Sequence, residues 1–327
     1  MRILVTGGAG YIGSHTVKLL LERGHTVTVF DNLSAGHRQA VPHARLVVAD
    51  LKDVDTLDHA FINDRIEGVI HFAASAYVGE SVTNPSKYYL NNLSNSLNLL
   101  ERVRRHGIAR FVFSSTCATY GIPETVPITE RESQKPINPY GNTKLAFERM
   151  LADYAPAHGI GSVALRYFNA AGAAADGSLG EDHTPETHLI PIVLQTALGK
   201  RPHVEVFGND YPTPDGTCIR DYVHVEDLAE AHLLALEQLV PGEFQAFNIG
   251  TGTGSSVKEV ITVAESITGK AIAVKYAPRR AGDPPMLVAS AEKIQRELGW
   301  KPKYPDVRSI IETAWKWLQK QPNGYAG

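Results

Sequence analysis

Short apolar runs alternate with amphipathic stretches over the first half of the chain. Six runs rich in Val, Ile and Phe and bounded by Gly, Asp, Asn or His predict buried parallel strands. They lie at 3–5, 27–30, 46–48, 68–72, 111–114 and 162–165. Helical periodicity occupies intervals between them, at 15–22, 54–63, 85–106 and 139–157. Strands alternating with helices predict an α/β fold, a Rossmann-type doubly wound parallel sheet.

The pattern changes after residue 168. A Gly, Ala and Asp-rich loop at 170–185 precedes a short helical pattern at 189–198 and a turn-rich region at 207–216. We expect a larger Rossmann domain at 1–168 and a smaller α/β C-terminal domain at 169–327, lying over the carboxyl edge of the sheet. The strand-like segment near 246–250 is expected to return to the larger domain.

Composition narrows the class of protein. The 327 residues are 43% hydrophobic and 20% charged with a net charge of −3, which is typical of a globular enzyme and offers no basic patch for nucleic acid. The most basic stretch, 102–106, ends a helical pattern and predicts a solvated helix terminus. Two cysteines predict a reducing cytosol, and neither a signal peptide nor a membrane span is expected.

A glycine-rich loop follows the first predicted strand. Gly7, Gly10 and Gly13 form GxxGxxG at the start of a helix, where backbone N–H groups can hold a pyrophosphate. Asp31 follows the second strand, so its carboxylate can accept ribose hydroxyls and favours NAD over NADP. The lysine of a phosphate-binding nucleotidase loop is absent. Asp50 and Leu51, after the third strand, would meet an adenine, or Asp50 would simply cap a helix.

Tyr140 and Lys144 are four residues apart in a predicted helix, so their side chains share a face. Asn138 and Pro139 favour a helix beginning at this point. A free tyrosine is a poor base at neutral pH, but an adjacent ammonium and an oxidised nicotinamide would each favour phenolate. Thr116, at the carboxyl end of a strand, would face the ligand crevice beside Tyr140. Together these positions predict a site that handles a proton beside a nicotinamide.

With these motifs the chain resembles the extended short-chain dehydrogenase/reductases, and within them the enzymes that epimerise UDP-glucose and UDP-galactose at C4. The resemblance spans essentially the whole chain. It rests on combined motifs rather than on any single one, at 6–15, 31–33, 71–74, 78–81, 114–116, 140–144, 166–169, 207–211, 220–225 and 279–283.

The resemblance implies reversible 4-epimerisation through a transient 4-keto sugar and retained NAD. Thr116, Tyr140 and Lys144 would be catalytic. Residues expected to bind the cofactor are Gly7, Gly10, Tyr11, Ile12, Gly13, Asp31, Asn32, Asp50, Leu51, Phe72, Ala73, Ala74, Asn91, Tyr140, Lys144 and Tyr167. Residues expected to bind the UDP-sugar are Thr116, Tyr140, Asn169, His188, Leu189, Phe207, Arg220, Arg280, Asp283 and Leu287. The arginines suit a pyrophosphate, because their planar forks bond it bidentately.

Four positions depart from the usual family pattern. Thr116 replaces a serine and keeps its hydroxyl, while His188 stands where many relatives have asparagine near the sugar phosphates. Ala76 replaces a lysine that some relatives place near the cofactor. Leu287 falls at a position that gates room for a 2-acetamido group, where tyrosine restricts the substrate. Activity on UDP-GlcNAc and UDP-GalNAc is therefore a hypothesis.

Other readings are less favoured. A 4,6-dehydratase requires an acid and a base after Thr116, where this chain has Cys117 and Ala118. A UDP-pentose or UDP-glucuronate epimerase stays open, since it shares the mechanism. A non-catalytic NAD-binding regulator would not need Thr116, Tyr140 and Lys144. Metal hydrolase chemistry is not expected, because the thirteen histidines show no HExxH or clustered ligand spacing. The resemblance also implies a homodimer, paired through the helices at 85–106 and 139–157.

Overall fold

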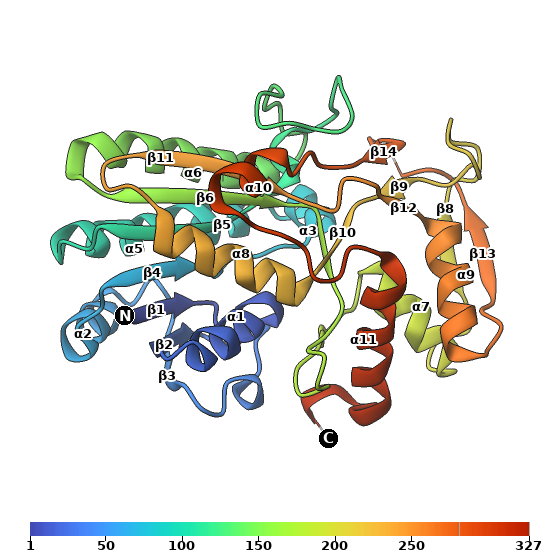
Figure 1. The fold of residues 1–327 in the computed structure, drawn as a ribbon, viewed down its shortest axis with the longest axis horizontal. Coiled ribbons are helices and arrows are strands. Elements are labelled where there is room, and N and C mark those ends of the chain that lie inside the picture. The colour runs from blue at the N-terminus through green and yellow to red at the C-terminus, as the bar shows by residue number, and fades with distance from the viewer. Residues whose placement is uncertain (281, 327) are drawn as a thin grey trace.

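The larger lobe is built on a seven-stranded sheet in which every neighbouring pair of strands is parallel (Figure 1). The computed structural model describes residues 1–280 and 282–326. In spatial order the strands are β11 (Phe244–Ile249), β6 (Gly161–Tyr167), β5 (Arg110–Thr116), β4 (Gly68–His71), β1 (Arg2–Thr6), β2 (Thr26–Asp31) and β3 (Arg45–Val48). The predicted Rossmann-type sheet is confirmed, and it includes β11, which is distant in sequence from β6.

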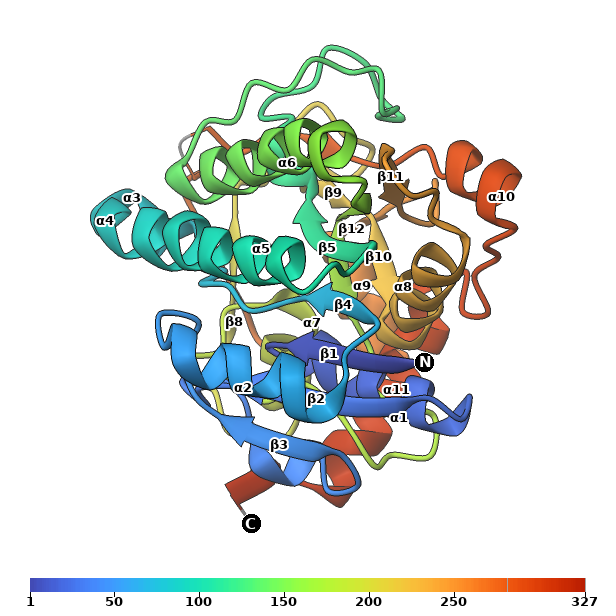
Figure 2. The ribbon, with the colours of Figure 1, turned by 90° about the vertical axis from the view of Figure 1, so that its left-hand side faces the viewer.

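Helices cover both faces of this sheet, as Figure 2 shows. One face carries α1 (Tyr11–Glu22) and α8 (Val225–Gln238), and the other carries α2 (Val54–Asp64), α5 (Asn95–Arg105) and α6 (Pro139–His158). Strand side chains such as Ile3 and Leu4 therefore alternate between two separate apolar cores. Burial on both faces explains why these strands read as continuous apolar runs.

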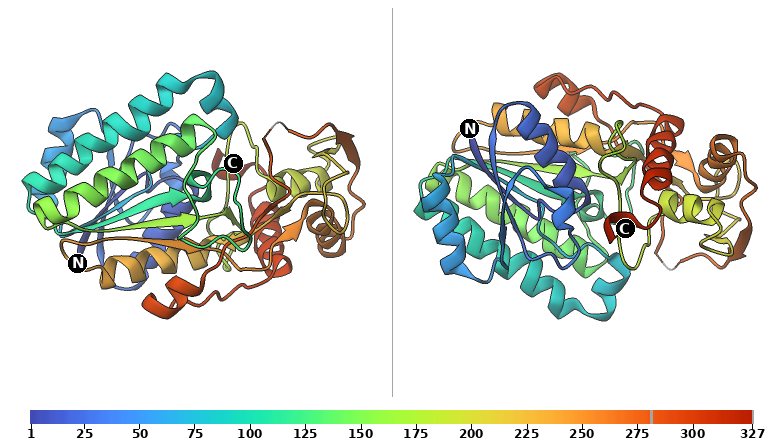
Figure 3. Two further views of the ribbon diagram at one scale, coloured as in Figure 1. Left: turned by 90° about the horizontal axis from the view of Figure 1, so that it is seen from above. Right: turned by 90° about the horizontal axis from the view of Figure 1, so that it is seen from below.

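The smaller lobe lies beyond the carboxyl ends of the strands (Figure 3). Its core is formed by α7 (Leu189–Ala197), α9 (Val257–Thr268) and α11 (Val307–Lys320), together with the parallel pair β8 (Val204–Phe207) and β13 (Val274–Ala277). A small sheet joins β12 (Ser255–Ser256), β9 (Ile219–Arg220) and β14 (Met286–Leu287). β7 (Asn169–Ala171) pairs with β10 (Tyr222–His224), and α10 (Glu292–Leu298) lies against β11 and α8.

Short elements complete the described chain. They are η1 (Arg38–Ala40), α3 (Val78–Thr83), α4 (Pro85–Tyr88), η2 (Tyr89–Ser94), η3 (Cys117–Thr119) and η4 (Gly324–Ala326). The single helix predicted at 85–106 is wrong in detail, because η2 is a π-helical segment between α4 and α5. None of the helices in the described part of the chain combines the length and apolar character that crossing a bilayer demands.

The basic stretch at 102–106 is only in part the solvated helix end that was predicted, since Arg104 and Arg105 are exposed but Arg102 is not. Arg102 is buried, and its Nε donates to Asp58 Oδ2 at 3.1 Å. His106 Nε2 lies 2.8 Å from the other oxygen of the same carboxylate. Arg102 and His106 therefore connect the end of α5 to Asp58 of α2. The local pattern of charges does not reveal this long-range pairing.

Four buried histidines should make the fold sensitive to acid. Burial lowers the pKa of His15 and His232 to about 4, and that of His71 and His224 to about 3. Their unfolded value is near 6.5, so below it the unfolded chain binds more protons and stability falls as pH falls. We expect each to cost roughly 2 kcal/mol between pH 6.5 and 5. Urea unfolding across this range should show a shallower pH dependence for His232→Gln, but not for the exposed His59→Gln.

Candidate active site

The loop between β1 and α1 forms a cradle that only glycine allows. Gly7 has a φ of +70°, and a Cβ there would lie 2.5 Å from the backbone nitrogen of Ala73. A Cβ on Gly13 would lie 2.3 Å from the carbonyl oxygen of Gly7. Gly10 caps α1 without any side-chain hydrogen bond, so the first N–H groups of the helix have no cap from a side chain. The cradle fits an anionic pyrophosphate at the helix N-terminus.

Gly13→Ala should therefore weaken binding of the dinucleotide at this loop. The added methyl group would clash with backbone atoms of Gly7 and Gly8, which cannot move without opening the loop. We expect NAD affinity to fall roughly ten- to a hundredfold. The NAD content of the purified protein measures this effect. Gly79→Ala is the matched control, since a Cβ on that exposed helical glycine meets nothing within 4 Å; an equal loss in both variants would contradict the assignment.

The acidic residue after β2 is held in place by backbone donors. Asp31 accepts hydrogen bonds from the N–H groups of Ala9, at 2.9 Å, and Leu33, at 2.8 Å. Burial raises the pKa of its carboxyl, and both hydrogen bonds oppose that rise. The position beside the glycine loop suits a contact with ribose hydroxyls.

Asn32, the next residue, donates to Asp50 Oδ2 at 2.9 Å. The alternative in which Asp50 caps the next helix is wrong, because Asp53 occupies the N-cap of α2 and accepts from the Thr56 N–H. The Leu51 side chain is buried in the core beneath. An adenine contact at Asp50 and Leu51 stays a prediction.

The loop after β4 carries Phe72, Ala73 and Ala74. Backbone N–H groups of Phe72 and Ala73 both donate to the Thr6 carbonyl, which anchors this loop against the glycine cradle. Asn91, in the π-helical segment, donates to the Ser75 hydroxyl. Its neighbour Asn92 is buried and bonds both the N–H and the carbonyl of Ser75. Asn92 was not predicted, because nothing in the sequence distinguishes the π-helical segment that holds it. Such segments often occur at functional sites.

Thr116, Tyr140 and Lys144 come together where β5 ends and α6 begins. Asn138 caps α6 by accepting from the Gly141 N–H at 2.8 Å, and Pro139 follows it. Tyr140 is therefore in the first turn of the helix, and the nearby Thr116 hydroxyl lowers the pKa of its phenol. Lys144 Nζ donates to the Ser114 carbonyl at 2.7 Å and lies 5.9 Å from the centre of the Tyr140 ring. The three predicted residues form one site.

The electrostatics of this trio differ from the prediction in one respect. Burial raises the pKa of Tyr140, the phenol of Tyr167 adds to the rise, and the Thr116 hydrogen bond opposes it. Lys144 Nζ is bonded to Ser114, and burial lowers the pKa of its ammonium to about 7. In the protein alone Tyr140 is therefore less acidic than a free phenol. The expected effect of Lys144 together with an oxidised nicotinamide stays a prediction.

Tyr167 and a buried ion pair stabilise the ends of β5 and β6 next to this site. The Tyr167 phenol is hydrogen-bonded to the Ser114 hydroxyl. Arg166 Nη2 lies 2.5 Å from Glu148 Oε2, with both side chains nearly inaccessible to solvent. Glu148 also accepts from Ser115, so the pair joins α6 to the ends of β5 and β6. No local sequence pattern identified Glu148 as a supporting residue, because its partner is eighteen positions away.

Residues predicted to bind the nucleotide-sugar come from the smaller lobe and the segments leading to it. Asn169 opens β7, and Phe207 ends β8 under the guanidinium of Arg280, at 3.9 Å from its ring centre. Arg220 is on β9 and is paired with Asp283. His188 and Leu189 are at the start of α7. Ala281, part of the motif at 279–283, lies outside the described residues.

A small apolar cluster connects these residues to the catalytic trio. It includes Cys117, the residue that follows Thr116. Burial raises the pKa of the Cys117 thiol, and the charge of Arg220 opposes that rise. Leu287, on β14 next to Arg220, packs in the same small apolar cluster as Cys117. The smaller lobe therefore meets the catalytic edge at these two side chains. The roles of Arg220 and Leu287 toward a substrate stay predictions.

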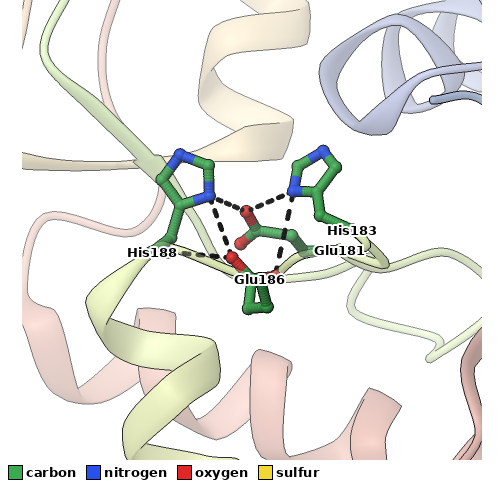
Figure 4. A group of neighbouring side chains, drawn as sticks. All are labelled: Glu181, His183, Glu186 and His188. Atoms are coloured by element: carbon green, nitrogen blue, oxygen red, sulfur yellow. Dashed lines mark hydrogen bonds and ion pairs between the residues drawn. The ribbon is translucent and has the colours of Figure 1, made fainter. Parts of the chain in front are cut away.

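His188 is not an isolated surface histidine. Its Nδ1 lies 2.6 Å from Glu181 Oε1 and 3.2 Å from Glu186 Oε1, and His183 adjoins the same carboxylates (Figure 4). Burial lowers the pKa of His188, but the two carboxylates outweigh that effect and hold it well above its ordinary value. The view that the histidines show no clustered ligand spacing is wrong here. The spacing ExHxxExH at 181–188 was the signal that would have found the cluster.

Fold and site define a dinucleotide-dependent enzyme of the short-chain dehydrogenase type, and comparison with known proteins agrees. The family model described as "NAD dependent epimerase/dehydratase family" matches residues 3–250, so the chain belongs to that family. NAD is its cofactor, and the glycine cradle with Asp31 would hold it.

The similar proteins are more specific. UDP-glucose 4-epimerase of Halalkalibacterium halodurans is 54% identical over 327 residues, covering 100% of this chain and 98% of that protein. A crystal structure of UDP-glucose 4-epimerase from Brucella ovis in complex with NAD is 51% identical, with a TM-score of 0.93 over 96% of this chain and 97% of that one. The UDP-Glc/GlcNAc 4-epimerase of Campylobacter jejuni is 43% identical, with a TM-score of 0.85 over 98% and 99%.

Proposed function

We propose that this chain interconverts UDP-glucose and UDP-galactose by reversible oxidation at C4. The observation that carries the proposal is the meeting of Thr116, Tyr140 and Lys144 beside the glycine cradle, at the carboxyl edge of the sheet. Bound NAD supplies the hydride acceptor, and after reduction the hydride donor. A relative that shares 54% of its residues over the whole chain bears the name of this activity.

Each catalytic residue has a role that its position permits. Tyr140 accepts the proton of the 4-hydroxyl as C4 loses hydride, and Thr116 holds the same oxygen. The resulting 4-keto sugar turns within the site, and Tyr140 returns the proton once hydride has been added to the opposite face. Lys144, one helical turn after Tyr140, would hold the nicotinamide ribose. Asn169, His188, Arg220 and Arg280 hold the nucleotide-sugar during the turn.

A direct experiment tests the activity. The purified protein is incubated with UDP-galactose and no added NAD, and the products are followed by NMR. We expect UDP-glucose to accumulate to equilibrium, because the cofactor is retained through the cycle. Separate incubations with UDP-GalNAc and UDP-arabinose define the range. A 6-deoxy-4-keto product would instead show a dehydratase, and the absence of any conversion would contradict the proposal.

Activity on N-acetylated sugars follows from Leu287. This side chain is partly buried beside Cys117 and is smaller than the tyrosine that closes the pocket in restricted relatives. A relative that bears the name of both activities has the same fold over nearly its whole length. Leu287→Tyr should lower turnover of UDP-GlcNAc at least about tenfold, with little change for UDP-galactose. Steady-state kinetics on both sugars measure this, and an equal loss on both would refute the gating role.

We further propose a homodimer in the cytosol. Large apolar side chains are exposed on the consecutive segments α3, η2 and α5: Val78, Val82, Tyr89, Leu90 and Leu97. Exposed apolar side chains gathered in one part of a chain are typical of a protein–protein interface. Both cysteines are unpaired, which suits a reducing compartment. Sedimentation velocity should give a species of twice the 35.6 kDa chain mass, and a monomer at micromolar concentration would contradict the dimer.

A further inference from the structure

Four potential metal ligands converge in the segment that joins β7 to α7. Figure 4 shows Glu181, His183, Glu186 and His188 with their ring nitrogens directed at the carboxylate oxygens. His183 Nδ1 is 3.2 Å from Glu181 Oε1 and 3.8 Å from Glu186 Oε2. His188 Nδ1 is 2.6 Å from Glu181 Oε1 and 3.2 Å from Glu186 Oε1. One ligand atom from each residue lies within 4.8 Å of all the others.

The carboxylates of this cluster are buried, and two polar atoms of the cluster lack a well-formed hydrogen bond. The side chains of Glu181 and Glu186 are only 5% and 3% exposed. Glu181 Oε1 and His183 Nδ1 are buried polar atoms without a hydrogen bond of acceptable geometry, although both face the centre of the cluster. Burying two carboxylates so close together is costly unless positive charge lies among them, and either protonated imidazoles or a metal ion can supply that charge. The lack of a well-formed hydrogen bond at Glu181 Oε1 and His183 Nδ1 favours the metal ion.

The distances and the donor types select the kind of cation. Zn²⁺ binds imidazole nitrogen and carboxylate oxygen at about 2.0–2.2 Å, so neighbouring ligand atoms of a tetrahedron are about 3.4 Å apart. The four His–Glu separations, from 2.6 to 3.8 Å, lie on both sides of that value, and the shortest must lengthen to admit the ion. Two imidazole nitrogens disfavour Ca²⁺ and Mg²⁺, which prefer oxygen ligands only. We propose that Glu181, His183, Glu186 and His188 form a site for a divalent transition-metal ion, best suited to Zn²⁺.

The surrounding contacts orient the ligands and indicate which segment a bound metal would hold in place. Glu186 accepts from the N–H groups of Thr187, at 2.7 Å, and His188, at 2.8 Å, which orients its carboxylate. Tyr77 donates to the Pro185 carbonyl, and the Tyr11 ring lies edge-on to His183 at 6.2 Å. The metal would therefore fasten the long connection before α7 beside the dinucleotide loop, and would hold His188 at the start of that helix.

Metal binding itself tests the proposal. Full-length protein is stripped with a chelator, dialysed and titrated with ZnSO₄ by calorimetry, and Co²⁺ is added separately as a spectroscopic probe. We expect one Zn²⁺ per chain and an absorption spectrum of four-coordinate Co²⁺. His183→Gln should weaken Zn²⁺ binding at least a hundredfold, whereas His59→Gln, at an exposed histidine of α2, should not.

Other outcomes would overturn the site. If no Zn²⁺ binds, or if binding survives His183→Gln unchanged, the cluster is only a network of ion pairs between charged imidazoles and carboxylates. Circular dichroism and NAD content establish that each variant is folded. If His183→Gln does not fold, Glu181→Gln serves in its place, with the same hundredfold loss expected. Neither residue has been assigned a contact with the sugar, so failure of this site would leave the proposed epimerisation intact.

Discussion

Tyr140→Phe is expected to lower kcat on UDP-galactose by roughly a thousandfold, the scale of a lost general acid–base catalyst. The substitution removes one oxygen and leaves the ring, which packs edge-on against Tyr88 at 6.4 Å. Binding of NAD and of the UDP-sugar should therefore persist. Turnover followed by NMR, NAD content and a substrate titration separate these effects.

A matched variant on the same helix controls for the loss of a phenol. Tyr154 lies in α6 and donates to Glu101 at 2.7 Å, away from the catalytic edge. Tyr154→Phe should retain nearly full turnover. If Tyr140→Phe also kept its activity, Tyr140 could not be the group that exchanges the proton with the sugar.

Glu148→Ala is expected to destabilise the fold by about 3–5 kcal/mol, because it leaves the Arg166 guanidinium buried without its carboxylate. The Glu148 and Arg166 side chains are 2% and 6% exposed, so water cannot replace the lost partner. The hydrogen bonds from Ser115 and Gln134 to the same carboxylate are lost as well. Urea unfolding monitored by circular dichroism measures the change.

The comparison variant is Glu312→Ala, which removes an exposed glutamate paired with Arg308 one turn away on α11. Pairs of this kind contribute little, so a much smaller loss is expected. Equal losses in the two variants would show that burial of the Arg166 pair does not matter to stability.

The sequence allowed the sheet and the cofactor loop to be predicted because both are governed by local rules. Buried parallel strands read as apolar runs whatever packs on them. Gly13 is needed because a Cβ there would meet the backbone of Gly7 in the same loop, and Gly7 is needed for its positive φ. The Tyr140 and Lys144 pair followed from the period of a helix. The return of β11 to the sheet could be anticipated from its strand-like run, and the structure places it beside β6.

What could not be predicted depends on partners distant in sequence or on an irregular backbone. Arg102 is buried because Asp58 lies across from it, and nothing near residue 102 indicates that pairing. The π-helical turn of η2 interrupts a pattern that is indistinguishable from an ordinary helix. The ligands at 181–188 lie in a loop without periodicity, where only the spacing of residue types could have indicated them. The substrate contacts came from family resemblance, because they are scattered over β7, α7, β8, β9 and β14.

The path of the chain between the lobes has a mechanical consequence. The backbone leaves the large sheet after β6, comes back for α8 and β11, departs again through β12, and touches the large lobe once more at α10 before ending in the smaller lobe. Several segments of the backbone therefore connect the two lobes. A single proteolytic cut in any one of them would leave the halves tethered, and hinge motion between the lobes must bend all of these crossings together.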